Sequence, residues 1–295
     1  TVIHGIVNLP AVFIVVVLTA CLVLGTRESA RLNNIMVAVK LAVIVAFLLV
    51  GVRYVTAANW HPLIPANTGE FGSFGWSGVL RGSAVVFFAF IGFDAVSTAA
   101  QEAKNPQRDM PIGILGSLLI CTVLYIAVAA VLTGIVPYKD LNVPDPVAKA
   151  VDLIGLTWFS VQVKIGALAG LTTVILVLLY GQTRIFFTMS KDGLLPRVFA
   201  DVHPQLRTPW KSQMLIGAAV AVVAALTPIG ILGEMVSIGT LFAFILVCGA
   251  VIYLRKSEAA GARPFRTPGV PVVPILGILF CLLLMAGPPP PPRLP

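Results

Sequence analysis

Eight long apolar stretches, separated by short polar connections, dominate this chain of 295 residues. A helix needs about 20 residues to cross the hydrocarbon core of a bilayer, and a helix satisfies its own backbone polar groups there. The first and sixth stretches are short by this measure, and the fifth is long enough to tilt. We therefore expect an all-α integral membrane protein with about eight transmembrane helices. The expected spans are Pro10–Gly25, Asn34–Val52, Trp76–Ala100, Pro111–Pro137, Phe159–Met189, Ser212–Pro228, Met235–Leu254 and Gly269–Gly287.

The composition excludes an ordinary soluble domain. Hydrophobic residues make up 58% of the chain and charged residues only 11%, whereas soluble domains carry about 25% charged residues. The four cysteines lie inside apolar stretches without metal-binding spacing, and no phosphate-binding loop or nucleophile motif is present. We expect no enzyme activity, no catalytic residue, no metal site and no cofactor.

Positive charge alternates from one connection to the next. The connections at 26–33, 101–111, 190–211 and 255–268 hold twelve of the Lys and Arg residues, against six on the other side. Since Lys and Arg accumulate in cytoplasmic loops, the first helix is predicted to run from outside to inside. An anionic inner leaflet explains the net charge of +8 better than a nucleic acid would. The lipid bilayer is therefore the expected partner, and no nucleic acid is.

One apolar stretch carries a glycine and a carboxylate near its middle, in the sequence FFAFIGFDAVST from Phe87. A charged group in hydrocarbon costs at least about 2.5–3.5 kcal/mol, so Asp94 is predicted to have a functional or structural partner. Asp94 could be a proton-coupling or network carboxylate, a cap for a helix break, or half of a buried pair. Gly92 permits such a break, although an aromatic-rich helix with a packing glycine is the alternative.

A second charge, Lys40, lies in the apolar frame NNIMVAVKLAVIVAFLLVG. It is seven residues beyond Asn33, which places it about 10 Å into the span. Lys40 is either a functional buried cation or a structural lysine that snorkels to the surface.

Several motifs in this chain resemble amino acid permeases of the APC superfamily, most closely the cationic amino acid transporter branch. They are EAKNPQRDMP after the Asp94 helix, GTRESARLNN (Gly25–Asn34), YGQTRIFFTMSKDGLLP (Tyr180–Pro196), SIGTLFAF (Ser237–Phe244) and RPFRTPGVPVVP (Arg263–Pro274). The resemblance runs from Asn8 to about Ala286. It implies an inverted-repeat transporter fold with broken helices, of which this chain would hold about helices four to eleven. The chain is accordingly expected to be a fragment.

The resemblance also implies residue roles. The unwound part of the broken helix would be Phe88, Ala89, Phe90, Ile91 and Gly92, with carbonyl groups turned toward the ammonium group of the substrate. Ser237 and Thr240 could line the same pocket. 

In proton-coupled members, a lysine on the fifth helix takes the place of a bound sodium ion, and Lys40 resembles it. Desolvation makes an ammonium group give up its proton more readily, which suits a proton carrier. Thr172 and Thr173 would face this lysine from the eighth helix, where hydroxyl groups can accept from it. Ordinary helix packing explains those threonines equally well.

The sequence thus predicts a single transmembrane permease domain over 1–287, followed by a Pro-rich tail at 288–295. We expect a monomeric, multi-pass protein of the inner (plasma) membrane that moves neutral or cationic amino acids by alternating access, with proton symport. The alternatives are an amino acid or polyamine exchanger and a non-transporting amino acid receptor on the same fold.

Overall fold

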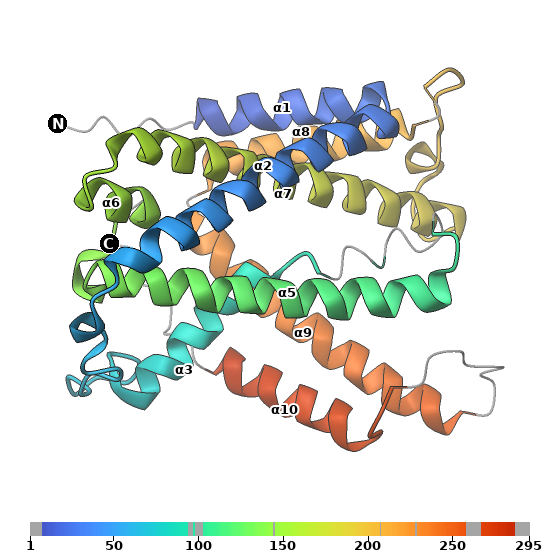
Figure 1. The fold of residues 1–295 in the computed structure, drawn as a ribbon. Helices are drawn as coiled ribbons and strands as arrows, with labels where there is room; N and C mark the ends of the chain where they lie inside the picture. The colour runs from blue at the N-terminus through green and yellow to red at the C-terminus, as the bar shows by residue number, and fades with distance from the viewer. Residues whose placement is uncertain are drawn as a thin grey trace. The chain divides into compact units, whose positions relative to one another are not determined.

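The computed structural model describes residues 8–93, 97, 103–143, 145–206, 208–227, 229–257 and 267–286, and these contain helices and no strands. This confirms the predicted all-α class (Figure 1). The α-helices are α1 (Leu9–Leu24), α2 (Thr26–Gly51), α3 (Gly75–Val86), α5 (Pro106–Ile135), α6 (Pro146–Leu153), α7 (Thr157–Lys191), α8 (Trp210–Leu226), α9 (Ile229–Lys256) and α10 (Val272–Met285). Short 3-10 helices lie at Val52–Tyr54, Ala57–Trp60, Phe87–Phe90 (η3), Tyr138–Asp140 and Arg197–Phe199.

Four of the described helices are long and apolar enough to cross a membrane. They are Ala30–Tyr54, Pro106–Ile135, Thr157–Lys191 and Met235–Arg255, and only 6% to 28% of their most apolar segments is buried within the protein. The helices α1, α8 and α10 are also apolar but shorter. Side chains such as Phe13, Leu119 and Leu168 stay more than 60% exposed. Lipid is a solvent that accepts such surfaces, because its acyl chains are as apolar as leucine.

The chain forms two compact units, each discontinuous in sequence. The first comprises Thr1–His61, Ala95–Gln101 and Ser117–Leu226, and the second comprises Pro62–Asp94, Glu102–Gly116 and Thr227–Pro295. The first unit therefore contains α1, α2, α6, α7, α8 and the larger part of α5. The second contains α3, α9 and α10. The predicted single domain over 1–287 stays a prediction, and the Pro-rich tail lies outside the described residues.

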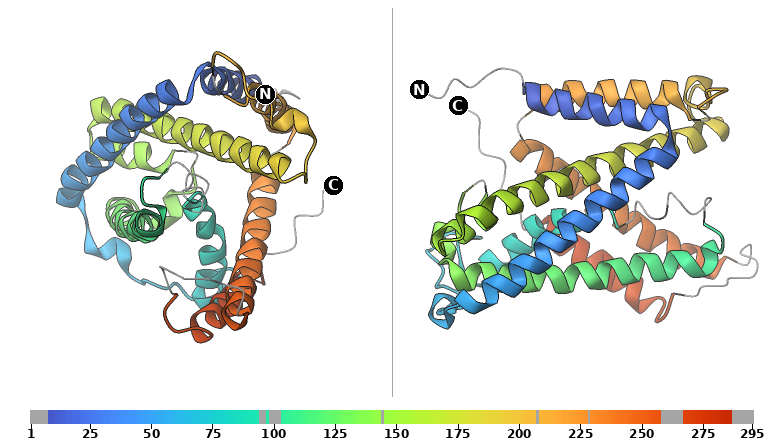
Figure 2. Two further views of the ribbon diagram at one scale, coloured as in Figure 1. Left: turned by 90° about the vertical axis from the view of Figure 1, so that its right-hand side faces the viewer. Right: turned by 45° about the horizontal axis from the view of Figure 1, so that its top comes forward.

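In the first unit, α1 lies along α8, as both figures show (Figures 1 and 2). Gly217 makes this approach close, since a Cβ atom there would lie 2.3 Å from the Thr19 hydroxyl oxygen. Two apolar clusters hold the unit together. One joins α1, α7 and α8 through Leu18, Leu22, Leu176, Leu179 and Ile216, and the other joins α2, α5, α6 and α7 through Phe47, Val131, Ala148, Val151, Phe159 and Val163.

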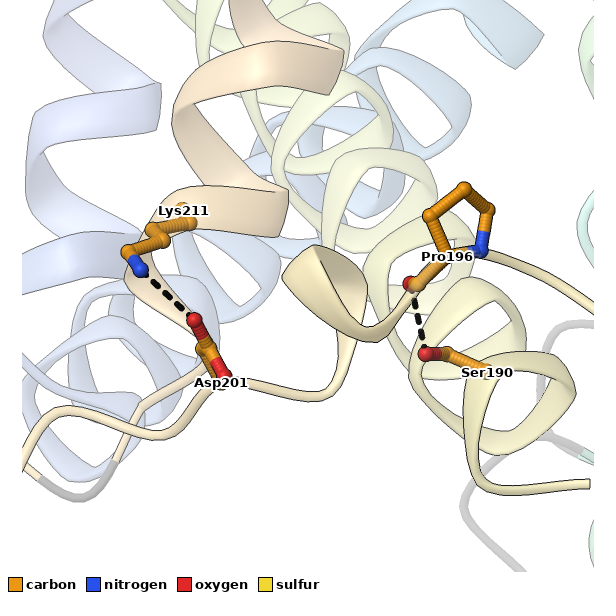
Figure 3. Close-up of polar contacts among 4 residues, drawn as sticks. All are labelled: Ser190, Pro196, Asp201 and Lys211. Atoms are coloured by element: carbon orange, nitrogen blue, oxygen red, sulfur yellow. Dashed lines mark hydrogen bonds and ion pairs between the residues drawn. The ribbon is translucent and has the colours of Figure 1, made fainter. Parts of the chain in front are cut away.

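The connection between α7 and α8 is fastened at several points. The Ser190 hydroxyl donates to the Pro196 carbonyl oxygen at 2.8 Å, and Lys211 pairs with Asp201 at 2.6 Å (Figure 3). The Thr208 hydroxyl donates to the Val23 carbonyl oxygen at 3.0 Å, which ties the connection to the end of α1. These bonds set how α1, α7 and α8 meet on the side that the charge pattern predicts to be cytoplasmic.

In the second unit, α9 packs against α10 and also contacts α3 and η3. Gly277 of α10 lies against α9, where its Cβ position is 3.0 Å from the Cys248 sulfur. The loop before α3 folds around Asn67, whose side-chain amide donates to the carbonyl oxygens of Glu70 and Phe74 and to the Ser77 hydroxyl. The first turn of α3 is thereby fixed to this loop.

We predict that Gly217→Ala destabilises the full-length protein by about 1–3 kcal/mol, because the added methyl group overlaps Thr19. Gly116 of α5 has no atom within 4 Å of its Cβ position, so Gly116→Ala is the matched control. It should be neutral, or more stable by up to about 1 kcal/mol through helix propensity. Apparent melting midpoints in detergent compare the two variants, and equal midpoints would contradict the close contact of α1 and α8.

Candidate transport site

The helix that begins at Gly75 is interrupted where the sequence predicts a break. Its α-helical part ends at Val86, and η3 follows over Phe87–Phe90. Gly92 then has a φ of +110°, a backbone conformation that residues with a side chain rarely adopt. The break covers the residues that we expected to be unwound. The span predicted over Trp76–Ala100 therefore begins as an α-helix that stops at Val86.

A phenylalanine of α9 holds the break from the side. The Phe244 ring lies 5.9 Å from the Phe87 ring in an edge-to-face arrangement and 5.4 Å from the Phe93 ring. Such aromatic pairs contribute about 0.5–1.5 kcal/mol beyond the area that they bury. Phe244 therefore contacts the chain on both sides of the interruption.

The two small polar residues expected in the pocket share the α9 face of Phe244. Ser237, Thr240 and Phe244 follow one another at helical spacings of three and four, which puts them in one row. Both polar residues are half-buried, and the Thr240 hydroxyl donates to the Val236 carbonyl oxygen at 2.8 Å. The second unit thus brings Ser237 and Thr240 onto the helix face whose Phe244 packs against the break.

The other residues expected at the break differ in exposure, and the structure does not describe all of them. Ala89 is exposed, whereas Phe90 and Ile91 are half-buried. The backbone of Phe88 belongs to η3, and its side chain is not among the described groups. Asp94 lies outside the described residues, so its three alternative roles all stay predictions.

In the first unit, Lys40 of α2 meets Thr173 of α7. The Lys40 ammonium group donates to the Thr173 hydroxyl oxygen at 3.4 Å, and that hydroxyl donates to the Gly170 carbonyl oxygen at 2.6 Å. Thr173 is only 3% exposed. A hydroxyl group has one proton and two lone pairs, so it can serve both partners at once. Thr172, which was expected beside Thr173 at this position, instead donates to Leu168 of its own helix at 2.7 Å.

A glycine on α7 allows this contact. A Cβ atom at Gly166 would lie 2.9 Å from Val43 of α2, whereas one at Gly170 would lie at an ordinary contact distance of 3.8 Å from the Lys40 side chain. Backbones that approach this closely bring the lysine stem against α7 instead of into lipid.

A cleft of about 230 Å³ opens beside Lys40. Apart from Lys40, its walls are aliphatic or aromatic side chains and glycines from α2, α5, α6 and α7, and among them are Phe47, Val128, Val147 and Val163. A water molecule takes up about 30 Å³ in the liquid. The cleft is thus large enough for several waters, and Lys40 is the charged group in its wall.

Two parts of these sites were not predicted from the sequence: the contact of Phe244 with the break, and the walls that Phe47 and Val147 give the lysine cleft. Phe244 could have been predicted from the sequence, because it ends the SIGTLFAF motif one turn after Thr240. The cleft could not have been predicted, because it forms between four helices and the sequence does not say which face each helix turns toward the others.

Three features together define a membrane transporter with discontinuous helices. They are apolar helices of membrane length, a helix interrupted at a glycine between aromatic residues, and a half-buried lysine between two helices. The particular family follows from sequence comparison. A family profile described as "Amino acid permease" matches residues 4–295. The chain belongs to this family, so it is part of a transporter and not an enzyme, and the resemblance to the APC superfamily is confirmed.

Curated relatives carry several transporter names. The chain is 47% identical over 278 residues to the "Methylthioribose transporter" of Bacillus subtilis, which covers 94% of the chain and 59% of that relative. It is also 47% identical over 279 residues to the "Branched-chain amino acid permease BcaP" of the same organism, covering 94% and 58%. Identity to the "Cationic amino acid transporter 9, chloroplastic" of Arabidopsis thaliana is 41% over 251 residues, covering 85% and 43%. The chain therefore spans somewhat under three fifths of the length of these two Bacillus subtilis relatives.

We predict that Phe244→Ala lowers amino acid uptake by the full-length protein at least fivefold, because the break loses the ring that packs against Phe87 and Phe93. Phe242→Ala is the matched control, since Phe242 lies on the same helix and is 54% exposed. Initial uptake rates at equal membrane abundance provide the measurement. Uptake that falls equally in both variants would mean that the break does not depend on Phe244.

Proposed function

We propose that this chain forms the substrate-binding and coupling part of a secondary active transporter that symports small neutral or cationic amino acids with protons by alternating access. The observation that carries the coupling is the contact between Lys40 and Thr173 in an otherwise apolar cleft. The observation that carries the substrate site is the interruption of α3 next to the polar face of α9.

The coupling proposal rests on the position of a half-buried lysine. Lys40 lies between two helices in the wall of an otherwise apolar cleft, where its amine would gain and lose a proton during a transport cycle. Protonated Lys40 supplies the positive charge that a bound sodium ion supplies in sodium-coupled members of the superfamily. Thr173 accepts a hydrogen bond from Lys40 in either protonation state, because a neutral amine still carries N–H donors. Thr172 remains part of the proposal as the neighbouring hydroxyl, and Asp94 as a network carboxylate.

The substrate proposal rests on the break. Carbonyl groups released from helical bonding over Phe88–Gly92 would receive the substrate ammonium group, and the rings around Gly92 would cover its side chain. A relative at 47% identity is named for branched-chain amino acids, which favours neutral substrates. An equally similar relative is named for methylthioribose, so that compound belongs in the same substrate panel.

We further propose that residues 1–287 act as one transmembrane domain of a monomer in the plasma membrane. The apolar helices and the bacterial relatives support the location in a membrane.

We predict that Lys40→Ala lowers proton-driven amino acid uptake by at least tenfold, because the proton carrier is removed. The full-length protein would be reconstituted in liposomes and given labelled leucine, alanine, arginine or methylthioribose under an inward proton gradient. A sodium gradient without a pH difference serves as the reference condition. Lys149→Ala is the control, because the Lys149 ammonium group bonds to the Asp140 carbonyl oxygen and does not line the cleft.

Proton-driven uptake that is unchanged in Lys40→Ala would overturn the coupling role. Wild-type protein that carries substrate only when the liposomes are preloaded would instead identify an exchanger. Binding without uptake or exchange would identify a receptor.

We predict that Thr173→Val lowers proton-driven uptake several-fold, because an unpaired buried polar group costs about 1–3 kcal/mol. Thr173→Ser keeps the hydroxyl and should restore uptake. Thr122→Val is the control for losing a threonine hydroxyl on a membrane helix, since Thr122 donates to Leu118 of its own helix. A serine variant as impaired as the valine variant would show that the methyl packing of Thr173 matters and the hydroxyl does not.

A further inference from the structure

A groove between α1 and α8 lies on the first unit, away from the lysine cleft. Its volume is about 420 Å³. Val16, Ala20 and Leu24 line it from α1, and Met214, Gly217 and Ala218 line it from α8. The walls are almost wholly apolar, so the groove suits a hydrocarbon ligand.

The floor of the groove has its polar groups satisfied. Gly217 and Thr19 are in close contact there, and the Thr19 hydroxyl donates to the Val15 carbonyl oxygen at 2.7 Å. A ligand that enters the groove therefore finds no polar group that needs a partner.

The shape and surroundings of the groove match an acyl chain. From Val16 to Leu24 the helix rises about 12 Å, so the groove is long and follows the helix axes. Val16, Leu24 and Met214 are 56%, 69% and 53% exposed. Lipid tails can reach such exposed apolar side chains on a helix that spans a membrane.

A cation and a tryptophan stand at one end of the groove. Lys211 precedes Met214 by three residues and Ala218 by seven, so it lies on the groove side of α8. Its ammonium group pairs with Asp201 at 2.6 Å (Figure 3). The same group lies 5.8 Å from the centre of the Trp210 ring. The Lys211 side chain is still 41% exposed. Tryptophan and lysine are typical of the depth at which lipid headgroups lie.

We propose that this groove and Lys211 form a binding site for an anionic phospholipid, with one acyl chain between α1 and α8 and the phosphate at Lys211. Asp201 holds the Lys211 ammonium group at the mouth of the groove. The phosphate approaches the side of that ammonium group that Asp201 leaves exposed. The charge pattern predicts that this end faces the cytoplasm, where anionic lipids are concentrated. The site is independent of the proposed transport mechanism.

Native mass spectrometry of the full-length protein, titrated with phosphatidylglycerol or phosphatidylcholine, tests the acyl part of the site. Ala218→Phe fills the groove and should weaken phosphatidylglycerol binding at least fivefold. Ala219→Phe is the matched control, because Ala219 is the next residue, is also exposed and does not line the groove. Equal binding by the two variants would overturn the proposal.

The headgroup part is tested with Lys211→Gln, which should weaken phosphatidylglycerol binding at least fivefold and leave phosphatidylcholine binding unchanged. Lys191→Gln is the control, since Lys191 ends α7 and lies 4.5 Å from the Phe187 ring, outside the groove. Equal losses for both lipids, or equal losses in both lysine variants, would contradict a phosphate contact at Lys211.

The same spectra show the number of protein copies. If Ala218→Phe reduces dimers and changes no lipid binding, the groove is an interface between copies of the protein, and the lipid proposal fails. Since lipid binding is measured without transport, a failure of proton coupling would leave this result unaffected.

Discussion

A charged lysine in the apolar middle of a helix must find an acceptor, and the packing of α2 on α7 supplies one. Hydrocarbon offers no hydrogen-bond partner, so a buried ammonium group without one would cost several kcal/mol. The Thr173 hydroxyl meets this need because it donates its own hydrogen bond to the Gly170 carbonyl oxygen, which leaves its lone pairs free to accept from Lys40. The contact requires close backbones, which Gly166 allows because a Cβ atom there would overlap Val43 of α2. The cleft beside Lys40 follows from the same packing.

In the second unit, backbone groups at the interruption of α3 also need surroundings other than lipid. Ending an α-helix within an apolar segment releases backbone groups that lipid cannot satisfy, so broken helices occur where protein or a cavity surrounds them. Phe244 supplies part of that surrounding from α9, and Gly92 supplies the backbone freedom. Each unit therefore carries one irregular polar feature held by tight local packing.

The side of the first unit that is predicted to be cytoplasmic is fixed by polar bonds. Thr208 ties the α7–α8 connection to the end of α1, Ser190 closes the turn after α7, and Asp201 holds Lys211. Lys211 lies one turn before Met214, which lines the α1/α8 groove. A lipid at this site would bind two helices of one unit at once.

Hydropathy and charge pattern by themselves determined the all-helical class and seven of the helical segments, because a helix in lipid must be long and apolar. The sequence permitted a break at Gly92 and the family resemblance implied it, and the structure supplied the backbone conformation at that glycine. Motifs in the sequence were enough to place the chain among amino acid permeases. The tertiary structure decided which side chains meet. Thr172 and Thr173 are adjacent in sequence but point about 100° apart on a helix, so only the rotation of α7 selects Thr173 for Lys40. The same applies to Phe244 and the break, since contacts between distant segments depend on helix packing that no local pattern encodes.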